Sequence, residues 1–184
     1  MTIDQLIENT GDYAKDIRLN FSTHLRQQTD LTPQQAWGTV LASAIATGNA
    51  ALIAAAFEQS REFLSPQQAE AAKAAATIMA MNNIYYRFQH LASNKKYATI
   101  PAKLRMNAIR THGSDPVDFE LWCTAVSAIN GCGACVDSHE KVLREKGVAE
   151  EKILAAVRIA SIVHAIASVI AIEKAVTSPQ PAAV

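Results

Sequence analysis

The chain has 184 residues, of which 49% are hydrophobic, and its 17 basic residues balance its 17 acidic ones. This composition can bury one core, so we expect a single domain over 1–184. The zero net charge argues against nucleic acid or an anionic membrane as the main partner, because both bind a basic face.

Helices are predicted almost throughout the chain, and three of them share one kind of start. Thr32-Pro33, Ser65-Pro66 and Asp115-Pro116 each place a capping side chain before a proline at the first helical position. The predicted helices cover 12–28, 33–47, 50–60, 66–92, 116–130, 132–146 and 150–175. We therefore predict an all-α fold, a single-domain helical bundle of about seven or more helices.

The segment 93–115 is the longest loop-like region and divides the chain into two possible halves, 1–93 and 115–176. Residues 80–84 and 128–132 resemble each other weakly, which would make the halves pseudo-repeats. The only candidate for a strand is the short stretch 97–100 before a proline.

The ends of the chain give an expectation about location. Residues 1–5 lack the basic segment followed by an apolar one that begins a secretory signal peptide. The longest apolar stretch, 159–172, is shorter than the roughly 20 residues that span a bilayer, so we interpret it as part of a central core helix. We therefore expect a cytoplasmic protein without a membrane partner, in which a close cysteine pair is redox-active or metal-binding.

Two of the three cysteines form a Cys-x-x-Cys motif, Cys132 and Cys135, and His139 follows four residues later. On a helix these three side chains share one face. The helix start favours a thiolate at Cys132, whereas His139 is well placed to take a proton from Cys135. Glu120, on the preceding helix, can polarise His139 or relay its proton. An oxidised cysteine can condense with its neighbour, and an external thiol must then restore the pair.

Other interpretations of these residues are open. The Cys-x-x-Cys motif and His139 supply three zinc ligands, and a fourth could come from Glu120, Asp137 or a partner chain. Cys123 lies within an apolar helical pattern and is interpreted as a buried structural residue. Four residues near the middle of the chain are interpreted as packing residues: Met79, Met81, Tyr85 and Tyr86.

Glu120, followed by Cys132-x-x-Cys135 and His139, resembles the alkylhydroperoxidase D (AhpD) family within the carboxymuconolactone decarboxylase-like superfamily. The resemblance covers nearly the whole chain and includes residues 13–17, 31–47, 79–83, 86–87, 104–107 and 119–132. It implies an all-helical homotrimer without a bound cofactor. It also implies a peroxidase that reduces alkyl hydroperoxides and a partner AhpC-type peroxiredoxin, with electrons from the dihydrolipoyl group of a lipoyl-bearing protein.

The resemblance also implies a role for each site residue. Cys135 would be the peroxide-reactive cysteine that becomes a sulfenic acid. Cys132 would be its disulfide partner and proton donor, with His139 and Glu120 as the proton relay. Some members carry a histidine immediately before the second cysteine, where this chain has Ala134. We therefore expect a weaker or differently tuned peroxidase activity.

Three functions follow from the sequence. The first is the thiol peroxidase that the resemblance implies. The second is a decarboxylase of the wider superfamily, which does not require a Cys-x-x-Cys motif. The third is a zinc-binding or redox-sensing module.

Overall fold

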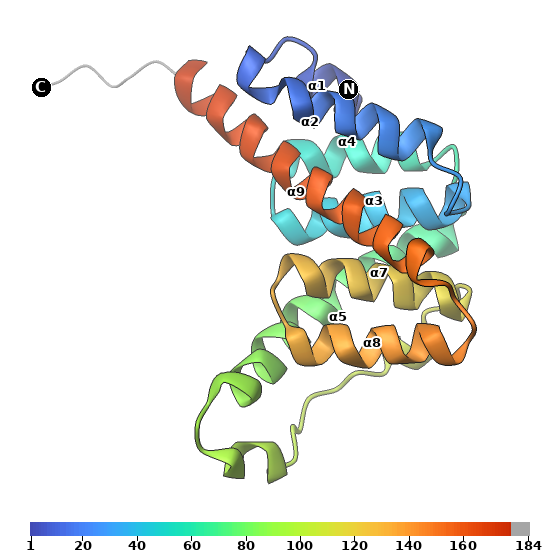
Figure 1. Ribbon diagram of the computed structural model, residues 1–184, viewed down its shortest axis with the longest axis vertical. Helices are drawn as coiled ribbons and strands as arrows, with labels where there is room; N and C mark the ends of the chain where they lie inside the picture. The colour runs from blue at the N-terminus through green and yellow to red at the C-terminus, as the bar shows by residue number, and fades with distance from the viewer. Residues whose placement is uncertain (178–184) are drawn as a thin grey trace, which may run out of the picture.

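The computed structural model describes residues 1–177, and these residues form helices without a strand, so the all-α prediction is confirmed. Figure 1 shows the helices in chain order from blue to red. The α-helices are α1 (Ile3–Ile7), α2 (Lys15–Ser22), α3 (Pro33–Thr47), α4 (Ala50–Ser60), α5 (Pro66–Leu91), α6 (Ala108–Thr111), α7 (Pro116–Ile129), α8 (Gly133–Glu145) and α9 (Glu150–Thr177). Shorter helical segments are η1 (Asp12–Ala14), η2 (Thr23–Gln27) and η3 (Lys95–Thr99).

The predicted helix starts at α3, α5 and α7 are confirmed in atomic detail. Thr32 Oγ1 accepts from the Gln35 amide at 3.2 Å, and Gln35 Oε1 accepts from the Thr32 amide at 3.1 Å. Ser65 and Gln68 form the same reciprocal pair. Asp115 Oδ1 accepts from two amides in the first turn of α7. Each cap stabilises its helix by about 1 kcal/mol because it satisfies amides that have no partner within the helix.

Three predictions of local structure differ in detail from the structure. The stretch 12–28 is divided among η1, α2 and η2, with a 3₁₀ turn at its start and a π-helical turn at its end. The strand candidate 97–100 overlaps the 3₁₀ helix η3, which local hydrogen bonds close from Tyr97 to Asn94 and from Ile100 to Tyr97. Helix α8 begins at Gly133 rather than at Cys132.

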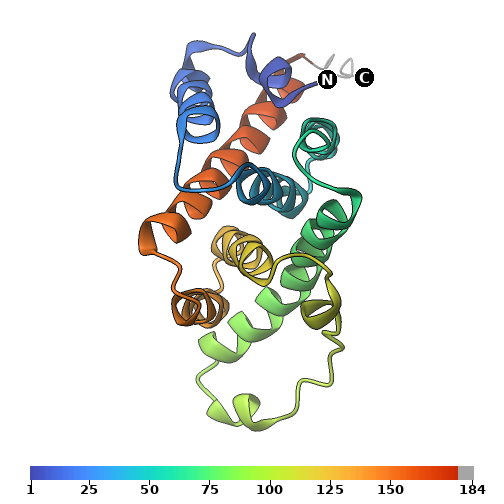
Figure 2. The same cartoon turned by 90° about the vertical axis from the view of Figure 1, so that its right-hand side faces the viewer.

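The centre of the molecule is formed by α3, α7 and α9, which pack against one another (Figures 1 and 2). Helices α3 and α7 approach closely at Gly38, where an added Cβ would lie 2.2 Å from the ring of Trp122. The Trp122 indole donates to the Gln35 carbonyl oxygen at 3.2 Å, and the Gln35 side chain donates to Asp118 at 2.8 Å. Burial raises the pKa of the Asp118 carboxyl above its ordinary value. This contact fixes α7, which carries Glu120, against the core.

Helix α9 is longer than the apolar stretch from which it was predicted. By length and composition alone it could cross a membrane, because it has 28 residues and an 18-residue window of mean hydropathy 2.1. The argument that residues 159–172 are too few to span a bilayer was therefore wrong for the helix that contains them. In this structure 44% of that window is buried, against α3 and α7 among others. The packing of α9 against α3 and α7 agrees with the interpretation of α9 as a central core helix.

Helix α5 connects the core to the site. Its first half packs in the core against α3, while it also contacts α7, α8 and the short α6. Its far end and the segment after it project from the body (Figures 1 and 2). Buried apolar residues from both proposed halves contribute to the hydrophobic core. The division into pseudo-repeats stays a prediction.

Candidate active site

The turn between α7 and α8 presents the cysteine motif. Gly131 has a φ of +64°, a left-handed conformation that glycine adopts without strain. The carbonyl oxygen of Asn130 accepts a hydrogen bond from Arg87, and its side chain donates to Asn83 Oδ1 at 2.9 Å. The Cys132 amide donates to the Ser127 carbonyl oxygen at 3.1 Å. Helix α5 therefore holds the turn from one side while α7 holds it from the other.

Cys132 and Cys135 are joined by a disulfide across the first turn of α8, with their Cα atoms 5.3 Å apart. This separation lies within the usual range for a disulfide. Cys132 occupies the cap position and Cys135 the first turn, so both lie at the positive end of the helix dipole. Cys132 is 0% exposed and Cys135 is 5% exposed. The helix-start argument therefore does not separate the two cysteines.

His139 and Glu120 are in direct contact, as their positions on adjacent helices predict. His139 Nδ1 lies 2.6 Å from Glu120 Oε2, and the two side chains are only 12% and 15% exposed. The other ring nitrogen, Nε2, lies 3.2 Å from the sulfur of Met79. A neutral imidazole carries one N–H, and the carboxylate is the stronger acceptor, so Nδ1 donates to Glu120. Glu120 thereby fixes the orientation of the ring.

A pocket of about 390 Å³ opens beside the disulfide. Cys135 and His139 line it, together with Ala134, whereas Cys132 and Glu120 are not among its lining residues. The complete lining is Met79, Asn82, Tyr86, Met106, Ile109, Ala134, Cys135, Ser138 and His139. A small molecule in this pocket therefore meets Cys135 rather than Cys132.

Several residues of the pocket were missed by the sequence analysis. Met79 and Tyr86 were interpreted as packing residues, but both line the pocket, and Met79 contacts His139. Met106 and Ile109 come from the region 93–115, which was predicted as loop-like but contains η3 and α6, and Ile109 lies on α6. Asn82 also lines the pocket, and it precedes Asn83 on α5, whose side chain makes hydrogen bonds to Ser127 and Asn130. No helical spacing relates these residues to the cysteine motif, and only the packing of α5 and of the segment before α7 brings them to the pocket.

The remaining cysteine behaves as predicted. Cys123 is a free, buried thiol on α7. Burial and the nearby Glu120 raise its pKa well above the ordinary value, which disfavours the reactive thiolate. Among residues 1–177, no group of three or more His, Cys, Asp or Glu side chains is arranged to hold a metal ion. Asp137, a candidate fourth zinc ligand, is exposed on α8.

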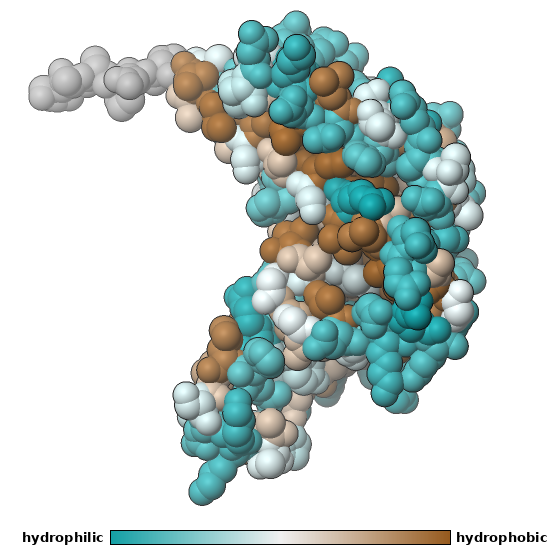
Figure 3. Space-filling model, in the orientation of Figure 1, coloured by the Kyte–Doolittle hydropathy of each residue, from teal (hydrophilic) through white to brown (hydrophobic). Residues whose placement is uncertain are grey.

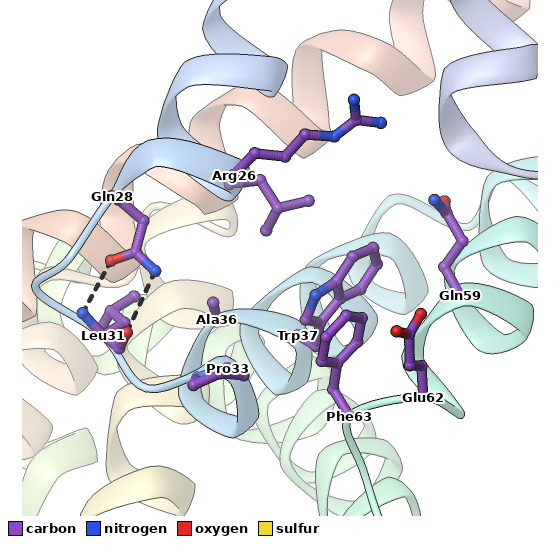
Figure 4. A pocket seen from close by; sticks show the side chains of 10 residues that line it. Arg26, Gln28, Leu31, Pro33, Ala36, Trp37, Gln59, Glu62 and Phe63 are labelled. Atoms are coloured by element: carbon purple, nitrogen blue, oxygen red, sulfur yellow. Dashed lines mark hydrogen bonds between the residues drawn. The ribbon is translucent and has the colours of Figure 1, made fainter.

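A second pocket, of about 490 Å³, lies away from the cysteines where residues 25–37 meet the end of α4. Figure 4 shows the rings of Trp37 and Phe63 side by side in it, with centroids 5.0 Å apart. Gln28 bonds to the backbone of Leu31 at its edge. Its lining contains no thiol or imidazole, so it lacks the chemistry that the first pocket has.

Comparison with known proteins identifies the relatives of this chain. The model of the carboxymuconolactone decarboxylase family matches residues 95–178, which include all four predicted site residues. The alkyl hydroperoxide reductase AhpD of Acidobacterium capsulatum is 66% identical over 95% of this chain and 95% of its own length. The chain belongs to the AhpD family.

Further AhpD proteins support this membership. That of Solibacter usitatus is 57% identical over 94% of the chain and 97% of its own length. That of Koribacter versatilis is 56% identical over 92% of the chain and 87% of its own length. The resemblance predicted from the sequence is therefore confirmed for the chain as a whole, beyond the region that the family model matches.

Proposed function

We propose that the protein is an alkyl hydroperoxide reductase in which Cys135 attacks the peroxide. The observation that carries the proposal is the pocket: Cys135 is the member of the disulfide that lines the pocket, and His139 lines the same pocket. The names of the AhpD relatives support the reaction, since each is called an alkyl hydroperoxide reductase.

The site residues supply and accept every proton that the proposed reaction moves. His139, oriented by Glu120, takes the proton of the Cys135 thiol, and the thiolate attacks the terminal oxygen of the hydroperoxide. The O–O bond breaks, Cys135 becomes a sulfenic acid, and Cys132 gives its proton to the departing alkoxide. Cys132 then attacks the Cys135 sulfur, and the hydroxide that leaves receives the proton held by His139. Two thiols become a disulfide as the hydroperoxide becomes an alcohol and water.

The disulfide must be reduced before another turnover. A dithiol of the dihydrolipoyl type, carried by a partner protein, is the proposed donor, because it reduces a disulfide and closes into its own. The name AhpD supports a partnership with a peroxiredoxin of the AhpC type. No bound cofactor is needed for these steps, and thiol chemistry of this kind suits the reducing cytoplasm.

We also propose that copies of the chain assemble, as a trimer in the family pattern. Figure 3 shows a face hollowed between α9 and the projecting end of α5, with hydrophobic side chains gathered in the hollow. On the outer part of α5, Ile84, Phe88 and Leu91 are exposed. Exposed apolar surface of this kind favours association between chains. Light scattering of the purified protein measures the number of copies.

The peroxidase proposal is tested by counting thiols after one equivalent of tert-butyl hydroperoxide is added to the reduced protein. We expect the wild type to lose two thiols to a Cys132–Cys135 disulfide. Cys132→Ser should instead accumulate a sulfenic acid that a specific reagent traps at Cys135, and Cys135→Ser should not consume peroxide. Trapping only at Cys132 in single-cysteine variants would reverse the assignment of the two cysteines. No loss of thiols in the wild type would contradict the function itself.

A further inference from the structure

Asn82 carries a buried polar atom that the fold does not use. The residue lies on α5, is 4% exposed, and its Oδ1 has no hydrogen-bond partner among residues 1–177. Leaving an acceptor buried without a partner costs stability, so such atoms are rare and point to a role outside the fold. Ser43 and Ser114 also carry an unpartnered buried oxygen, but of the three residues it is Asn82 that lines the pocket of Cys135.

The neighbouring asparagine makes the contrast clear. Asn83 is also buried on α5, but its Nδ2 donates to Ser127 Oγ at 3.0 Å and its Oδ1 accepts from Asn130 at 2.9 Å. These bonds tie α5 to the last turn of α7 and to the turn that presents the cysteines. Asn83 therefore has a structural explanation, and Asn82 does not.

We propose that Asn82 Oδ1 binds the terminal hydroxyl of the hydroperoxide, accepting a hydrogen bond from the O–H group that Cys135 attacks. This inference rests on the proposed peroxidase function and adds a substrate-binding residue to it. Asn82 and Cys135 are adjacent across the pocket wall, since Cys135 Sγ lies 4.0 Å from the Asn82 backbone oxygen. A carbonyl oxygen accepts this bond without competing for the proton that the reaction moves.

The hydrogen bond persists through the oxidation step. As the Cys135 thiolate forms a bond to the terminal oxygen and the O–O bond breaks, the hydrogen on that oxygen stays where it is. It becomes the hydrogen of the sulfenic acid, so Asn82 Oδ1 accepts from the peroxide first and from the S–O–H group afterwards. When Cys132 displaces the hydroxide and the disulfide forms, that donor leaves the site. The disulfide form of the protein is the form in which Asn82 has no partner.

The rest of the pocket indicates the class of substrate. Met79, Met106 and Ile109 give it largely apolar walls, and Tyr86 adds an aromatic ring. An apolar substituent fits such walls, while a single acceptor at Asn82 recognises the O–H end. The site therefore selects a hydroperoxide with an organic substituent. A dialkyl peroxide lacks the O–H donor and would be rejected.

The test compares two oxidants of the same reduced protein in single-turnover experiments. tert-Butyl hydroperoxide offers an O–H donor, whereas dithiodipyridine oxidises the thiols by disulfide exchange without one. We expect Asn82→Leu, which keeps the branching and the number of heavy atoms of the side chain, to slow oxidation by the hydroperoxide about tenfold, the change for one lost hydrogen bond at a buried group. Oxidation by dithiodipyridine should stay within about twofold of the wild-type rate, because the thiols themselves are unchanged.

Ser43→Ala is the matched control. It also removes an unpartnered buried oxygen, but Ser43 lies on α3 outside the pocket. Both variants should unfold at the same or a higher urea concentration than the wild type, because each loses an unsatisfied acceptor. Only Asn82→Leu should change the ratio of the two oxidation rates. Asn82→Ala should change that ratio in the same direction and provides a second reading if leucine disturbs the packing.

The outcomes separate this inference from the function on which it rests. If the wild type reacts with tert-butyl hydroperoxide and both Asn82 variants react as fast, the role of Asn82 is wrong while the peroxidase function stands. If both oxidants slow equally in the Asn82 variants, Asn82 acts on the thiols and the substrate-binding role is again wrong. If the wild type itself does not react with hydroperoxide, the function and the inference are wrong together.

Discussion

The contact between Glu120 and His139 makes a quantitative prediction about the proton relay. Glu120→Gln keeps the shape of the side chain but removes its charge, at a place where the Oε2 to Nδ1 distance is 2.6 Å. Both side chains are largely buried, so solvent screens the pair only partly. The variant isolates the effect of the carboxylate charge on the imidazole that is proposed to accept the Cys135 proton.

The magnitude follows from the kind of bond that is lost. A hydrogen bond to a charged group in a partly buried site contributes about 1.5–3 kcal/mol. At about 1.4 kcal/mol for each factor of ten, the full value corresponds to roughly 10- to 150-fold in rate. Only the share of this hydrogen-bond energy that is gained when His139 takes up the proton lowers the barrier. We therefore expect the lower end of that range, about tenfold.

The assay is the rate at which reduced protein loses thiols in excess tert-butyl hydroperoxide, followed by rapid quenching. Glu58→Gln is a matched control, because it neutralises an exposed carboxylate on α4 that pairs with Arg61 and does not line the pocket of Cys135. The control should react at the wild-type rate. If Glu120→Gln also reacts at the wild-type rate, the carboxylate does not assist His139 and the relay is wrong.

Three further predictions concern the core and the pocket. Gly38→Ala should lower the free energy of unfolding in urea by about 1–3 kcal/mol, because the new Cβ would lie 2.2 Å from the buried ring of Trp122; unchanged stability would refute the close helix contact. Burial raises the pKa of Asp118, so the unfolded chain loses this proton at a lower pH than the folded protein, and the free energy of unfolding should fall as pH rises through the ordinary carboxyl range. Asp118→Asn should reduce that fall in urea titrations at several pH values, and an unchanged pH dependence would contradict this role of Asp118. Ala134→His adds an imidazole to the pocket and should speed thiol oxidation by hydroperoxide; an equal or slower rate would show that Ala134 does not limit the activity.

Much of the helical structure could be predicted because its determinants are local. A cap, a proline and a glutamine within four residues fix the starts of α3 and α5 whatever surrounds them. No comparable local sequence signal indicates the division of 12–28 into three helical segments. The strand candidate 97–100 was wrong because a short apolar stretch is compatible with a strand or a helix. Local backbone hydrogen bonds from each residue to the third residue before it form a 3₁₀ helix there instead.

The site could be predicted only as far as helical spacing reaches. Cys132, Cys135 and His139 belong to one turn and one helix, and Glu120 belongs to the helix that the turn folds back. Asn82 and Met106, by contrast, come from segments far away in the chain. Their presence in the pocket depends on how α5 and the region before α7 pack around α8, which periodicity does not specify.

The start of α8 changes how the two cysteines should be distinguished. From the sequence, the expected place of Cys132 in the first turn of the helix favoured a thiolate there, whereas the position of His139 favoured Cys135. With the helix beginning at Gly133, the dipole acts on both cysteines, and access to the pocket becomes the difference between them. Under the proposed mechanism the reducing dithiol meets the same constraint as the peroxide. It must attack the Cys135 sulfur from the pocket and expel Cys132 as the leaving thiolate, so both halves of the cycle use one entrance, the one that Ala134, His139 and Asn82 line.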